Sequence, residues 1–157
     1  MSGNYRIVVG VDGSDGGRSA LRWALHEAAS RGGTVQAVTA WRWDEFDLPG
    51  KAATRPDQEQ ERAERTLAHE IESLPEFERS RVAIASEVVE GRAADVLTAT
   101  SRDADLLVVG SHGHGRVRHT VLGSVSEECV RKSLCPVVVL PVGQGTHHPP
   151  ADPAIRA

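Results

Sequence analysis

Short apolar segments that suit buried β-strands alternate along this chain with segments of helical periodicity, and this alternation limits the possible fold more than any other feature. Residues 5–11 (YRIVVGV) are apolar and β-branched on both faces, and residues 105–110 (DLLVVG) form a similar run. Such runs are typical of inner strands in a parallel sheet that helices cover on both sides. Residues 34–41, 81–89 and 136–142 are three further predicted strands.

Apolar residues at helical spacing mark four helices between these strands. The first follows the turn at residues 12–17 and stops at Gly32-Gly33, and the second ends before Pro75. The other two occupy residues 93–100 and 124–133. Strands that alternate with helices predict a single-domain α/β fold: an open five-stranded parallel sheet with helices on both faces.

Composition limits the class of protein. The chain has 157 residues, 39% of them hydrophobic, and a net charge of −4, so we expect one globular core and no nucleic-acid partner, which would favour a basic excess. The N-terminal residues show no signal-peptide pattern and no segment long enough to span a bilayer, which predicts a cytoplasmic protein without membrane contact. Cys129 and Cys135 are interpreted as reduced, small, buried residues.

Two segments lie outside the strand and helix pattern. Residues 42–58 form a polar loop, and the tail after residue 143 is rich in proline, so both are expected to be mobile or disordered. We therefore predict a domain over residues 1–143 and a disordered tail over 144–157. The His147-His148 pair in this tail lacks the rigid ligand set of a metal site, and no metal site is predicted.

The segment from Val108 to Val125 (VVGSHGHGRVRHTVLGSV) places three spaced glycines between a buried strand and a helix. Glycines at the carboxyl end of a strand let the backbone approach phosphate oxygens, and the free N–H groups of the next helix add donors and a positive dipole end. This pattern predicts a phosphate-binding loop. There is no G-K-[ST] sequence, so the chain is not a P-loop NTPase.

The glycine pattern resembles that of universal stress proteins of the ATP-binding subgroup, in which G-x-x-G, nine residues and G-[ST] follow the fourth strand. Gly110-Ser111-His112-Gly113, then residues 114–122, then Gly123-Ser124 match it. The resemblance extends over about residues 5–142 and includes the GVDGS sequence that begins at Gly10. It implies a Rossmann-like fold of the adenine nucleotide alpha hydrolase type, with strand order 3-2-1-4-5.

The resemblance also implies which residues bind ATP, with Mg²⁺. In the family the aspartate after the first strand approaches the adenosine and the end of the second strand offers backbone groups to the adenine; by position these are Asp12 and Ala40. Asp12 has an alternative interpretation as an Asx-turn or helix-capping residue. The implied binding residues are Gly10, Asp12, Ala40, Gly110, Ser111, Gly113, Gly123, Ser124 and Val125.

Charged and titratable residues fill the stretch between the glycines. Arg116, Arg118 and His119 could compensate phosphate charge, although each is also an ordinary solvated loop residue. His112 and His114 suggest a metal or a general base, but no third ligand or nucleophile accompanies them, so we interpret them as loop residues beside the phosphates. No catalytic residue is predicted.

Three functions remain open from the sequence. The first is a regulatory or sensing protein that holds ATP, hydrolyses it slowly at most, and acts in the stress response. The second is an enzyme of the same superfamily that transfers adenylate or phosphate, and the third is a dimerisation module with a vestigial nucleotide site. In the family the strand at 136–142 lies at the sheet edge, where it can pair with a second copy, so a homodimer is expected.

Overall fold

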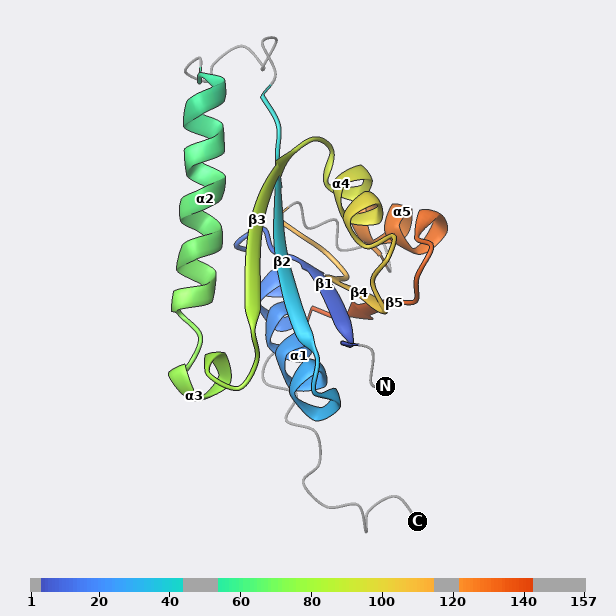
Figure 1. Ribbon diagram of the computed structural model, residues 1–157. Coiled ribbons are helices and arrows are strands. Elements are labelled where there is room, and N and C mark those ends of the chain that lie inside the picture. The colour runs from blue at the N-terminus through green and yellow to red at the C-terminus, as the bar shows by residue number, and fades with distance from the viewer. Residues whose placement is uncertain (1–3, 44–53, 115–121, 143–157) are drawn as a thin grey trace.

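The computed structural model describes residues 4–43, 54–114 and 122–142, and these form a three-layer α/β domain (Figure 1). The strands and helices follow in chain order: β1 (Arg6–Gly10), α1 (Asp15–Arg31), β2 (Thr34–Trp41), α2 (Pro56–Glu72), α3 (Glu76–Arg79), β3 (Ile84–Glu90), α4 (Ala93–Thr100), β4 (Leu106–Gly110), α5 (Ser124–Lys132) and β5 (Val137–Leu140).

The five strands form one parallel sheet in the order β3-β2-β1-β4-β5, which confirms the predicted fold and strand order. Ile7 of β1 pairs with Val35 of β2 on one side and with Leu106 of β4 on the other. The chain passes outward from β1 to β3 and then returns to add β4 on the other side of β1. Because the order reverses between β1 and β4, the loops after these two strands diverge and leave a crevice at the carboxyl edge of the sheet.

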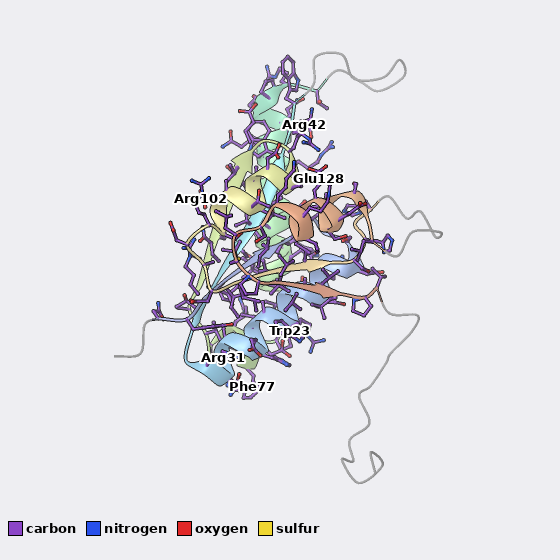
Figure 2. All side chains as sticks on the ribbon, turned by 90° about the vertical axis from the view of Figure 1, so that its right-hand side faces the viewer. Trp23, Arg31, Arg42, Phe77, Arg102 and Glu128 are labelled. Atoms are coloured by element: carbon purple, nitrogen blue, oxygen red, sulfur yellow. The ribbon has the colours of Figure 1, made fainter. Side chains whose placement is uncertain are left out.

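Both faces of the sheet are buried, as the continuous apolar strands predict. Alternate residues of β1 point to opposite sides: Ile7 and Val9 pack with α1 and α2, whereas Val8 packs with α4 and α5. Figure 2 shows α4 and α5 on one side of the sheet and α1 on the other. Cys129 of α5 is fully buried in the second cluster, and burial together with nearby Glu128 raises the pKa of its thiol to about 11.

The ends of α1 follow from local chemistry. Ser14 caps its N-terminus, and the Ser14 hydroxyl accepts a hydrogen bond from the Gly17 N–H at 3.1 Å. Gly32 ends the helix in a left-handed conformation with φ of 65°, which glycine adopts without steric cost. The sequence predicts the end at Gly32, but it places residues 12–17 in a turn, whereas α1 already begins at Asp15.

Three other predicted segments differ from the structure by more than one residue at an end. Residues 42–58 were expected to be a loop, yet α2 already begins at Pro56, where proline loses no helical hydrogen bond. The predicted strand at 81–89 is β3, which spans Ile84–Glu90, because residues 80–83 form a turn after the short helix α3, which the sequence does not predict. The predicted strand at 136–142 is confined to Val137–Leu140.

Some of the segments singled out by the sequence lie outside the residues that the structure describes. The tail at 144–157, with its histidine pair, and the arginines of the glycine-rich stretch fall there. Within the three described ranges, no helix is both long enough and apolar enough to cross a bilayer.

Replacement of a core leucine tests the two-sided core. Leu25 is 1% exposed and packs between α1 and the sheet, whereas Leu134 is 74% exposed. We expect Leu25→Ala to lower the free energy of unfolding by about 2–5 kcal/mol, since it leaves a cavity that the core fills only in part. The matched change Leu134→Ala should alter it by less than about 0.5 kcal/mol. Urea denaturation followed by circular dichroism gives both values, and equal losses would contradict this packing.

Candidate functional site

A cavity of about 260 Å³ lies at the carboxyl edge of the sheet, where the order of strands reverses. Loops after β1 and β4, the end of β2, and the first turns of α4 and α5 surround it. The cavity is lined by all nine residues that the sequence predicts to bind a ligand: Gly10, Asp12, Ala40, Gly110, Ser111, Gly113, Gly123, Ser124 and Val125. Residues separated by more than one hundred positions are thus brought to one place.

One end of the cavity is apolar. Val38 and Leu97 line it from β2 and α4, and Val109 lines it from β4. Gly10 lines the same end. A Cβ atom at Gly10 would lie 2.9 Å from Leu97 Cδ1, so the absence of a side chain there lets Leu97 pack against the backbone. Such a surface suits a flat apolar ring.

Backbone groups at the end of β2 border the same region. The Val11 N–H donates to the Val38 carbonyl at 2.9 Å, so the backbone groups of Val38 face β1. Backbone direction alternates along a strand, and the groups of Ala40 therefore face the same side, beyond the last pair of β1 with β2 at Gly10 and Val38. This geometry gives Ala40 an N–H and a C=O that can read the edge of a ring.

Asp12 forms the Asx turn that the sequence offers as one interpretation, and it also lines the cavity. Its Oδ1 accepts hydrogen bonds from the N–H of Ser14, at 2.9 Å, and from the Ser14 hydroxyl, so the Asx turn is present. Its Oδ2 lies only 2.7 Å from the place that a Cβ atom of Gly113 would take. Gly113 therefore makes room for the carboxylate, and Asp12 is exposed at the cavity.

Ser111 joins three backbone segments below the cavity. Its carbonyl oxygen accepts from the Gly123 N–H at 2.6 Å and from the Ser126 hydroxyl at 2.9 Å. Its own hydroxyl accepts from the Val142 N–H at 3.0 Å. Ser126, which is 2% exposed, was not singled out by the sequence, because a serine within a helix has no pattern that distinguishes a buried hydroxyl from a solvated one.

The first turn of α5 faces the cavity through Ser124 and Val125. Gly123 is its N-cap and supplies no side-chain acceptor. N–H groups in the first turn have no partner within the helix, so this end carries partial positive charge and can bind anions.

The two histidines of the glycine-rich loop make hydrogen bonds within the loops. His112 Nδ1 lies 3.2 Å from the Ser111 hydroxyl. His114 Nε2 donates to the Asp12 carbonyl and so joins the loop after β4 to the loop after β1. Among the described residues no group of three His, Cys, Asp or Glu side chains could hold a metal ion.

Substitution of Gly110 by alanine tests the close contact between the backbones of Gly110 and Gly16 below the cavity. The Cβ atom would lie 2.7 Å from the Gly16 carbonyl carbon, and backbone cannot move away cheaply. We expect Gly110→Ala to lower the free energy of unfolding by about 1–3 kcal/mol. Gly123→Ala should cost less, because its nearest neighbour is 3.0 Å away. Thermal unfolding of both variants measures the difference, and an equal cost would argue against the contact.

Comparisons with known proteins relate this chain to one family. The model of the universal stress protein family matches residues 4–141. Two universal stress proteins of Mycobacterium tuberculosis are 34% and 37% identical to the chain over 139 residues, which is 85% of the chain and 47% and 44% of those proteins. The chain thus spans about half the length of these curated relatives.

Solved structures give the same result. A universal stress protein from Archaeoglobus fulgidus in complex with dAMP has a TM-score of 0.63 and 26% identity, over 86% of this chain and 96% of that one. A protein of the universal stress protein family from Burkholderia pseudomallei has a TM-score of 0.65 and 29% identity, over 90% and 98% of the two chains.

Proposed function

The chain belongs to the universal stress protein family, and on that basis we propose that it binds ATP and acts as a regulatory or sensing protein in the stress response. The observation that carries the proposal is the convergence of nine predicted binding residues on one cavity with an apolar end and a donor-rich end. The relative from Archaeoglobus fulgidus, which is in complex with dAMP, supports an adenine nucleotide as the ligand.

The proposed arrangement follows the polarity of the cavity. The adenine would lie between Val38 and Leu97, with its edge at the Ala40 backbone, and the ribose hydroxyls would donate to Asp12. The phosphates would lie at the glycine-rich loop and the first turn of α5, where backbone N–H groups and the helix dipole favour anions.

Mg²⁺ is part of the proposal. No lysine or arginine is among the described residues that line the cavity, and a divalent cation is one way to compensate the charge of a triphosphate. Hydroxyl and carboxylate oxygens, which Mg²⁺ prefers, are present at Ser124 and Asp12. A bound Mg²⁺ would neutralise phosphate charge.

We propose that ATP is held rather than turned over. Asp12 is the one carboxylate among the described residues that line the cavity, and its Oδ1 accepts from the Ser14 N–H and hydroxyl in the Asx turn. His114 Nε2 donates to the Asp12 carbonyl. These contacts engage both side chains in the structure of the loops, which supports a holding role. A cytoplasmic location and a separate tail after residue 143 are further parts of the proposal.

Titration with MgATP tests the ligand. We expect saturable binding by nucleotide-free protein in isothermal calorimetry, and a loss of affinity of about 100-fold or more in Gly123→Glu, whose carboxylate would repel the phosphates. Gly123→Ala is the control, since it adds a side chain at the same residue without adding a negative charge.

If Gly123→Glu and Gly123→Ala bind MgATP with equal affinity, the phosphates do not lie at this loop. Absence of binding by the parent protein would favour the vestigial site, and multiple-turnover ATP consumption that depends on Asp12 or His112 would favour an enzyme.

A homodimer through β5 is the second part of the proposal. The Pro136 and Leu140 carbonyls accept from β4, so by alternation the backbone groups of Val137 and Val139 point outward from the edge strand. Exposed Val130 lies on the adjoining helix α5. These open groups fit pairing with a second copy across a two-fold axis.

Val139→Pro tests this edge. Proline removes the outward N–H without breaking the pairing of β5 with β4, so we expect a shift from dimer to monomer in analytical ultracentrifugation at micromolar concentration. Val139→Thr keeps the N–H and should remain dimeric. A monomeric parent protein, or a Val139→Pro variant that dimerises normally, would count against this interface.

A further inference from the structure

Glu70 of α2 is a buried carboxylate outside the cavity. Its side chain is 4% exposed, although glutamate is almost never buried without a partner. Its Oε2 accepts a hydrogen bond from Arg18 Nε of α1 at 2.9 Å. The ion pair therefore joins α1 to α2 on the face of the sheet opposite α4 and α5.

Arg18 also reaches the loop that carries Asp12. Its Nη2 donates to the Gly13 carbonyl at 3.2 Å, and its Nη1 donates to Asp15 Oδ1 at 3.0 Å. Gly13 has φ of 80°, a left-handed conformation that shapes the turn after β1. One guanidinium thus connects Glu70 with the backbone next to Asp12.

The helix α2 touches this turn directly as well. Thr66, one turn before Glu70, places its Cγ2 atom 3.0 Å from the position that a Cβ atom of Gly13 would take. On the other side of the loop, His114 donates to the Asp12 carbonyl. The loop is held from two sides, by Arg18 at Gly13 and by His114 at Asp12.

We propose that Glu70 is a positioning residue for the nucleotide site. Its carboxylate fixes the Arg18 guanidinium in the orientation that donates to the Gly13 carbonyl, and this contact holds the turn that presents Asp12 to the cavity. The Arg18 side chain is 52% exposed, and Asp15, the carboxylate that would still pair with it without Glu70, is 66% exposed. A solvent-exposed pair restrains a side chain weakly, so without Glu70 the guanidinium would hold Gly13 for a smaller share of the time. The proposal rests on the nucleotide site proposed above.

The chain supplies a matched control pair on the same helix. Arg22, one turn after Arg18, donates through Nη2 to Glu78 Oε1 of α3 at 2.8 Å, and the Glu78 side chain is 11% exposed. This pair joins α1 to α3, and no contact of either side chain with the turn at Gly13 is among the described interactions. Figure 2 shows Phe77 of α3 near Arg31 at the C-terminal end of α1.

The test compares Glu70→Gln with Glu78→Gln. Each change removes one charge from an arginine pair at nearly constant side-chain volume. We expect Glu70→Gln to weaken MgATP binding about three- to tenfold in isothermal calorimetry and Glu78→Gln to change it less than about twofold. Circular dichroism at the titration temperature shows that both variants are folded. The double variant Arg18→Met with Glu70→Leu replaces the pair by apolar side chains and should bind as weakly as Glu70→Gln.

Amide hydrogen exchange in the absence of nucleotide gives a second measurement. The Ser14 N–H, which donates to Asp12 Oδ1 within the turn, should exchange faster in Glu70→Gln than in the parent and at an unchanged rate in Glu78→Gln. If the parent protein binds MgATP and the two variants bind it with equal affinity, the positioning role is overturned while the nucleotide site stands. If the parent protein does not bind MgATP, the proposed function fails by itself, and an unchanged exchange rate at Ser14 in Glu70→Gln would then overturn the inference independently.

Discussion

The close approach of the first turn of α1 to the end of β4 sets the separation of the two loops that surround the cavity. Gly110 lies so near Gly16 that a Cβ atom would be 2.7 Å from its carbonyl carbon. With the helix in this place, Asp12 meets Gly113, and His114 reaches the Asp12 carbonyl. The cavity therefore depends on backbone packing between helix and sheet, and its polar contacts follow from that packing.

The sequence predicts the parts of this arrangement that rest on strong local patterns. Strands buried on both faces have no polar alternation, so β1 and β4 are recognisable from composition, and the residues of the glycine-rich loop are recognisable from their spacing. Strand order follows from the family resemblance. The start of α2 was missed because residues 56–62 contain no apolar residue, so no periodicity marks that end of the helix.

Other parts depend on tertiary contacts that no local pattern reports. Leu97 has the spacing of an ordinary core residue, but it also forms a wall of the cavity against Gly10. Glu70 lies in a helix with several exposed glutamates and looks the same in sequence, although it is 4% exposed. Whether a residue of this kind faces solvent or a neighbouring helix is decided by the angle at which the helices pack, and this angle is not written in the sequence around it.

Burial of Cys129 has a consequence for the chemical durability of the site. Oxidants attack the thiolate form of cysteine, and a thiol with a pKa of about 11 is ionised to about one part in ten thousand at neutral pH. Cys129 is 0% exposed and anchors α5 against the sheet. The helix whose first turn borders the cavity is thus anchored by a thiol that is both buried and protonated, so we expect α5 to keep its place under conditions that modify exposed thiols.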